Sequence, residues 1–266
     1  MKFFRHSADR LPVFLFLVAF AVDLVVYYFA TELWMVVAWM FIGIFHKSCI
    51  CSFGHHHQHL PTFKQTILNR LLEIVYGFHT GITSHAWFLH HVIGHHRSYM
   101  DQEKDPSAWK RPDGTPMGEV EYAFVIAGTG YPRAYGCGDE FPKHRRIFVS
   151  MLLVQICLLV LLFAHNWVNA LFVFLLPMAI SLLITAWHTY FHHSGLDTDD
   201  HFHASHNITH KWYNILTGNL GYHTAHHMQG GLHWSKLPEL HASIADKIPE
   251  ELVHDPCIPF KWMPAK

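Results

Sequence analysis

The sequence predicts an all-α integral membrane protein, a bundle of four transmembrane helices with a helical cap, on three observations. Four long apolar segments occur in two closely spaced pairs, and each is about as long as a bilayer is thick. Hydrophobic residues make up 51% of the 266 residues and charged residues only 15%, which is apolar for a soluble protein. Histidine is in surplus, with 27 residues against 19 lysines and arginines. We treat residues 1–266 as one membrane domain.

The first pair of apolar segments covers residues 11–31 and 33–53. The first segment is too long for the apolar core of a signal peptide. The link Thr31-Glu32 is so short that the two segments must form a helical hairpin. Asp23 interrupts the first segment, and we expect it to face a neighbouring helix because acids within a bilayer usually point away from lipid.

A long polar region, residues 54–145, follows the first hairpin. Within it, Ile67–Val92 is amphipathic and aromatic, which predicts a helix lying in the membrane interface. The portion Lys104–Pro142 is rich in glycine, proline and charge, which predicts an ordered loop.

The second pair of apolar segments covers residues 147–164 and 168–187. His165-Asn166-Trp167 forms the turn between them, and Pro177 predicts a kink in the last segment. The remaining polar region, residues 188–266, joins the earlier polar region to form the predicted cap.

The distribution of basic residues predicts which side of the membrane the cap faces. Four spans place both termini and both polar regions on one side, and these segments carry nearly all the lysines and arginines. The two short turns on the other side carry none. The positive-inside rule therefore predicts cytoplasmic termini and a cytoplasmic cap.

Cysteine usage and net charge exclude other classes of protein. The five cysteines are irregularly spaced, so no disulfide framework is predicted and the chain is expected in a reducing compartment. The formal net charge is -1 and there is no basic stripe, so no nucleic-acid partner is expected.

Three histidine clusters lie in the predicted cap, and their spacing indicates metal binding. They are His55-His56-His57-Gln58-His59, then His91 to His96, and His223 to His227. On helices, spacings of three and four residues place imidazole rings on one face. Structural zinc takes about four ligands, so this number of imidazoles suits two metal ions better. A catalytic iron also needs an open position for oxygen.

The clusters follow the forms His-x3-His, His-x3-His-His and His-x2-His-His, divided by two pairs of apolar segments. With these three clusters and two pairs of apolar segments, the whole chain resembles the membrane fatty acid desaturase and hydroxylase superfamily. The second cluster, in its longer form, also resembles that of alkane hydroxylases. The segment Leu237-Pro238-Glu239-Leu240-His241 is similar to the tail of many acyl desaturases.

The resemblance implies a non-haem di-iron centre that activates O2 and attacks an unactivated C–H bond of a lipid. The implied ligands are His55, His59, His91, His95, His96, His193, His223, His226 and His227. The register is open at three places: His55 to His57, His90 or His91, and His192 or His193. Electrons are expected from a separate donor, such as a ferredoxin or a cytochrome b5-like protein with its reductase.

Residues that support the ligands are also expected, because carboxylates commonly hold the tautomer of a metal-binding imidazole. Asp105 is the first candidate, and Asp101, Asp197, Asp199 and Asp200 are alternatives. His188, His192 and Asn207 are further candidates for polar support.

The predicted function is O2-dependent desaturation of a fatty acyl or related lipid chain in the bilayer. Hydroxylation, or oxidative decarboxylation to a terminal alkene, remains open. An alternative from another class is a histidine-rich metal transporter or metal-binding membrane protein. A transporter places its ligands within the spans, whereas here only Asp23, His46 and Gln155 break the apolar runs.

Overall fold

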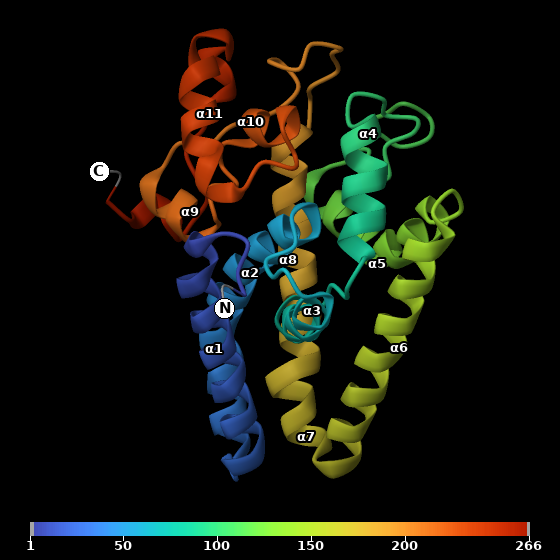
Figure 1. Cartoon of the computed structure of the whole chain (residues 1–266), viewed down its shortest axis with the longest axis vertical. Helices are drawn as coiled ribbons and strands as arrows, with labels where there is room; N and C mark the ends of the chain where they lie inside the picture. The colour runs from blue at the N-terminus through green and yellow to red at the C-terminus, as the bar shows by residue number, and fades with distance from the viewer. Residues whose placement is uncertain (1–2, 265–266) are drawn as a thin grey trace.

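The structure is a computed structural model that describes residues 3–264. These residues form helices and loops, with isolated β-bridges but no β-strand. Long helices stand together in one half of the molecule, and short helices and loops form a cap over the other half (Figure 1). The predicted all-α bundle of four membrane helices is confirmed.

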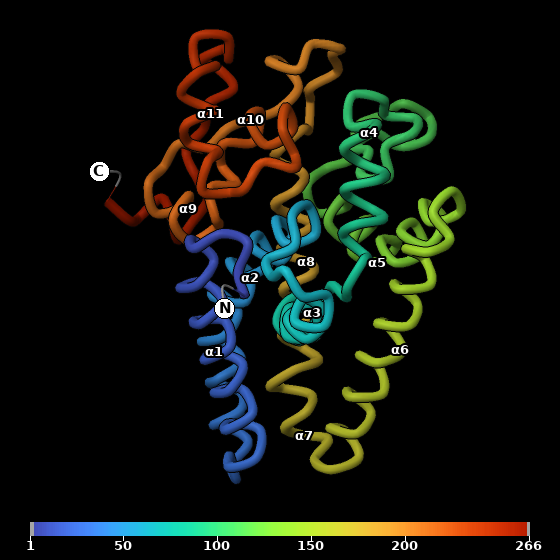
Figure 2. The backbone as a smooth tube through the Cα atoms, in the orientation of Figure 1, coloured from blue at the N-terminus to red at the C-terminus, as the bar shows by residue number. Residues whose placement is uncertain are grey.

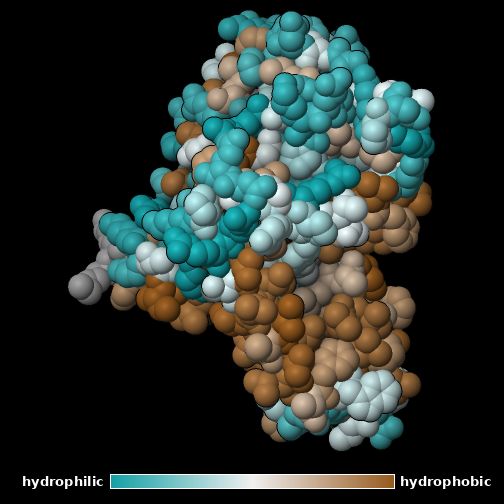
Figure 3. All heavy atoms as spheres, turned by 90° about the vertical axis from the view of Figure 1, so that its right-hand side faces the viewer, coloured by the Kyte–Doolittle hydropathy of each residue, from teal (hydrophilic) through white to brown (hydrophobic). Residues whose placement is uncertain are grey.

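Two helical hairpins form the bundle. The first pairs α1 (Arg10–Phe29) with α2 (Leu33–His59). The second pairs α6 (Pro142–His165) with a continuous run of α7 (Trp167–Ala170), the π-helix η3 (Leu171–Leu175) and α8 (Leu176–His193). All four are long and apolar enough to cross a membrane. Hydrophobic residues cover this half of the surface and hydrophilic residues cover the cap (Figure 3).

Two of the helices continue beyond the predicted spans. α2 ends at His59 and not at residue 53, and α8 ends at His193 and not at residue 187. At 27 residues, α2 is about 40 Å long, which exceeds the roughly 30 Å hydrocarbon thickness. Hydropathy falls where the histidines begin, but the helix continues because these side chains are buried against protein. The first histidine cluster is therefore the end of a spanning helix.

Helix α3 (Thr66–Thr80) lies across the bundle and is seen end-on in Figure 1 and Figure 2. It is amphipathic as expected, with Leu72, Val75 and Phe78 buried and its contacts made mainly with α2 and α8. The predicted helical stretch to residue 92 breaks at Gly81, which has a φ of 70°.

The predicted loop over residues 104–142 was wrong in part, because it contains the helix α5 (Glu119–Cys137). Three glycines and Pro132 weaken the helical signal of this segment. Tertiary packing outweighs that weakness, since Tyr122 and Ile126 are buried in a cluster with Ala186 of α8.

The cap is built from both polar regions. The first supplies the π-helix η2 (Phe88–His95), α4 (His96–Ser98) and the loop that follows. The second supplies α9 (Lys211–Leu216), α10 (His223–Met228) and α11 (Leu237–Ile244). Five short 3-10 helices complete the described elements, namely η1 (Ser7–Asp9), η4 (Trp234–Lys236), η5 (Ala245–Lys247), η6 (Glu250–Leu252) and η7 (Phe260–Trp262).

Asp23 faces a neighbouring helix, as expected. Its carboxylate is fully buried, lies 2.5 Å from the Lys47 ammonium of α2, and accepts a hydrogen bond from Trp39 at 2.8 Å. The buried acid within the apolar run is therefore neutralised by a partner within the bundle.

Candidate metal centre

Five imidazoles converge in the first of two groups. They are His55 and His59 of α2, His91 of η2, His96 of α4 and His226 of α10, and their ligand atoms all lie within 4.8 Å of one another. The Nε2 atom of His55 lies 2.7 Å from that of His91 and 3.1 Å from that of His59. The Nε2 atom of His96 lies 3.0 Å from those of His91 and His226.

A second group adjoins the first and contains His95, His193 and His227. The Nε2 atom of His193 lies 3.2 Å from that of His95 and 3.1 Å from that of His227. His223 joins this group, with its Nε2 atom 3.1 Å from His193 and 3.2 Å from His227. The rings of His96 and His227 stack with centroids 4.2 Å apart, so the two groups touch.

These separations fit two bound cations. For a metal–nitrogen bond of about 2.1 Å, neighbouring nitrogens lie about 3.0 Å apart in an octahedron and about 3.4 Å apart in a tetrahedron. The closest Nε2 atoms lie 2.7–3.2 Å apart, which is close enough for neighbouring nitrogens to share one cation. Each neutral imidazole has only one N–H donor. So many converging nitrogens therefore cannot all pair with one another by hydrogen bonds.

Burial keeps the rings in the protonation state that binds metal. Burial, followed by repulsion from neighbouring imidazoles, lowers the pKa of His91, His96 and His226 well below the usual value of 6.5. Neutral imidazole offers the lone pair that a cation needs. At neutral pH these imidazoles are therefore uncharged, and each has a nitrogen lone pair available to bind a cation.

The second cluster owes its arrangement to a π-helix. His91 and His96 are five residues apart, and the wider turn of η2 brings their Nε2 atoms to 3.0 Å. Gly94 allows this turn to pack closely, because an added Cβ would lie 2.5 Å from Cγ of Pro106 and 3.0 Å from Sγ of Cys137. The expected helix is present here, and its turns are those of a π-helix.

The third cluster has the expected α-helical spacing, and Asn207 holds the start of α10. The Asn207 side chain donates to Oγ1 of Thr224 at 2.8 Å and accepts from the Thr224 backbone N–H at 3.1 Å. His223, His226 and His227 then point to the cluster from one helical face. Asn207 thus contacts the helix that carries the imidazoles, and not the imidazoles themselves.

Asp105 lies where a tautomer-fixing carboxylate is expected. Nδ1 of His95 is 2.9 Å from both of its oxygens, and the Ser107 backbone N–H donates to Oδ1 at 2.7 Å. Burial alone would raise the pKa of Asp105, but the interaction with His95 outweighs burial and lowers it. Three alternatives make surface contacts instead: Asp101 with Lys104, Asp197 with Lys110 and Asp200 with His203.

The open registers can be read from the ring positions. Nδ1 of His193 donates to the backbone carbonyl of Ala204 at 2.7 Å, which leaves Nε2 facing the cluster. The ring centroid of His192 lies 3.9 Å from that of His223, and Nε2 of His188 lies 3.3 Å from Sγ of Cys257. Neither residue belongs to the two groups. His90 is likewise buried outside them.

Sequence reasoning missed the acid that contacts His57, one of the extra histidines of the first cluster. Nε2 of His57 lies 3.2 Å from the Glu73 carboxylate of α3, and Arg70 and Ser84 also contact that carboxylate. Burial raises the pKa of Glu73, but the bond to His57 and the other contacts lower it to about 2. His57 therefore fixes α2 against α3 while His55 and His59 face the cluster.

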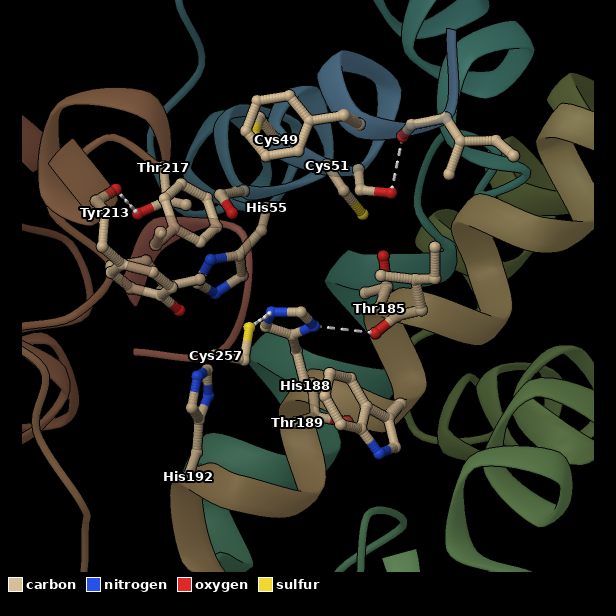
Figure 4. Close-up of a pocket in the computed structure, with 18 of the residues that line it drawn as sticks. Cys49, Cys51, His55, Thr185, His188, Thr189, His192, Tyr213, Thr217 and Cys257 are labelled. Carbon is tan, nitrogen blue, oxygen red and sulfur yellow. Dashed lines mark hydrogen bonds between the residues drawn. The ribbon is translucent and has the colours of Figure 1, made fainter. Parts of the chain in front are cut away.

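A cavity of about 430 Å³ leads from the bilayer half of the molecule to the imidazoles. Its lining begins at lipid-facing Phe41 and Phe45 of α2 and ends at His55, His91 and His223. Figure 4 shows His55, His188 and His192 turned into this space. An apolar chain in this cavity would lie directly beside the two groups of imidazoles.

Comparison with known proteins agrees with this geometry. No curated protein and no solved structure matches the chain. The family model described as fatty acid desaturase matches residues 31–257, a range that contains every imidazole of the two groups. The chain therefore belongs to the fatty acid desaturase family.

Proposed function

We propose that this protein is an O2-dependent membrane oxidoreductase that desaturates a fatty acyl or related lipid chain at a di-iron centre. The observation that carries the proposal is the pair of adjoining imidazole groups at the end of an apolar cavity. Membership of the fatty acid desaturase family supports a lipid substrate. The transporter alternative is disfavoured because the groups lie at the ends of the spanning helices.

The first group would hold one iron, and the second group with His223 would hold the other. When bound, the irons would supply the reductive activation of O2 that breaks a strong C–H bond. The protein's own part is to hold protons at Nδ1 of His95 and His193, through Asp105 and the carbonyl of Ala204, so that each Nε2 lone pair faces a cation.

The cavity supplies position and excludes water. Its lining is largely apolar, so an alkyl chain is stabilised there by burial. Electrons would come from a separate donor protein, and the positive-inside rule places the cap and both termini in the cytoplasm. Hydroxylation and decarboxylation would use the same residues, so product analysis decides among the three reactions.

The test joins metal analysis to product analysis. Purified protein is expected to contain two irons per chain, and a host that expresses it should gain a lipid with a new double bond. His226→Ala should lose bound iron and the new product, whereas His203→Ala, on the exposed cap surface, should keep both. One zinc per chain, or unchanged lipids with full iron content and a supplied electron donor, would contradict the proposal.

A further inference from the structure

A second cavity lies beside the first and shares one wall with it. The second cavity has a volume of about 440 Å³. Five residues line both cavities: Trp187, His188, His192, Tyr213 and Cys257. Figure 4 shows Cys257 between the rings of His188 and His192, with its Sγ atom 3.3 Å from Nε2 of His188. A single ligand that filled both cavities would pass these residues.

The two cavities differ in chemistry. The first runs along lipid-facing Phe41 and Phe45. The second includes polar residues at an outer rim, where His254, Asp255 and Lys261 are exposed. Together the cavities match an amphiphile, with its apolar chain in the first and its polar head in the second.

The rim presents one ammonium group that is loosely held. Lys261 Nζ lies 3.4 Å from the Asp255 carboxylate, and the two side chains are 60% and 79% exposed. Such exposed pairs contribute little to stability, so a ligand carboxylate can replace Asp255 at little cost. His254 and His206 add a hydrogen-bonded pair, with Nε2 of His254 2.8 Å from Nδ1 of His206.

We propose that the second cavity binds the carboxylate of an unesterified fatty acid, with Lys261 as its cationic partner. This proposal rests on the proposed function, because it assigns the head of the substrate whose chain occupies the first cavity. A carboxylate matches one ammonium group. A head with several phosphates needs several cations, whereas Lys261 is the only lysine or arginine among the described residues that line this cavity. An alkane has no group to fill the polar rim.

The experiment measures binding to the full-length, iron-loaded protein in lipid nanodiscs. Dodecanoic acid, methyl dodecanoate, dodecane and lauroyl-coenzyme A each compete with a fluorescent fatty acid. Dodecanoic acid should compete about three- to fivefold better than the other three. Lys261→Met should weaken dodecanoic acid by a similar factor, the upper size expected for one exposed ion pair, and should leave the ester and the alkane unchanged.

Two matched variants separate charge from structural damage. Lys261→Arg should retain affinity for dodecanoic acid within about twofold. Asp255→Asn removes the competing acid and should strengthen binding, which a disrupted fold would not do. Equal binding of the acid and its ester, tightest binding by lauroyl-coenzyme A, or full binding of the acid by Lys261→Met would overturn the proposal.

Iron content, measured on the same samples, separates this proposal from the proposed function. Binding that depends on Lys261 in protein without two irons would support the head-group site and contradict the di-iron reaction. Two irons and a new lipid double bond, with no preference for the acid, would contradict the head-group site alone.

Discussion

Replacing Asp105 with asparagine should weaken one metal site and spare the other. The carboxylate contacts Nδ1 of His95, and His95 belongs to the second imidazole group only. Asparagine retains an oxygen for the Ser107 backbone N–H but loses the negative charge that fixes the His95 tautomer. The surrounding packing is unchanged, because the two side chains have nearly the same shape.

The size of the effect follows from the position of Asp105. Asp105 is only 6% exposed, so water cannot take the place of its negative charge. Loss of such a partner typically reduces metal affinity 10- to 100-fold, or by about 1.4–2.8 kcal/mol. We expect a fall from two tightly held irons toward one per chain when a chelator of graded strength is added.

The assay is iron retention measured against chelator concentration in detergent-solubilised protein. Asp101→Asn is the matched control, because Asp101 lies on the surface beside Lys104 and should behave as wild type. Equal loss of both irons, or retention identical to wild type, would refute the reasoning that Asp105 acts through His95 on one site.

Two further predictions concern stability, measured by thermal unfolding in detergent. Gly94→Ala should destabilise the protein by about 1–3 kcal/mol, because the new methyl group would meet the ring of Pro106 at 2.5 Å; Gly128→Ala, which meets nothing within 4 Å, should be neutral or stabilising, and equal effects would contradict the packing argument. Lys47→Met should destabilise by about 3–5 kcal/mol, because it leaves Asp23 charged and buried without its partner, and a second change, Asp23→Leu, should recover much of the loss.

Hydropathy predicted the four membrane helices because burial in lipid requires a long apolar segment. It could not predict where α2 and α8 end, because their last turns carry histidines that are buried by protein. Helix α5 was missed for a related reason. Its glycines and Pro132 lower the local helical propensity, and its packing against α8 comes from residues far away in the sequence.

The spacing of histidines predicted the cluster, but not which rings turn inward. His55, His56 and His57 are equivalent in local sequence. His57 instead contacts Glu73, which lies on another helix far away in the sequence. The π-helix of the second cluster was unpredictable for the same reason, since its wider turn depends on Gly94 packing against Pro106 and Cys137.

The position of the imidazoles also indicates that metal binding and folding are linked. The cluster buries the nitrogen Nδ1 of His55, His223 and His226 without a hydrogen-bond partner among the described residues, and burying such groups costs free energy. Converging Nε2 lone pairs repel one another as well. Bound cations would remove the repulsion between Nε2 lone pairs, and their ligands would come from α2, η2, α4, α8 and α10. Metal should therefore hold the cap onto the bundle, and a chelator should loosen the cap before the membrane helices separate.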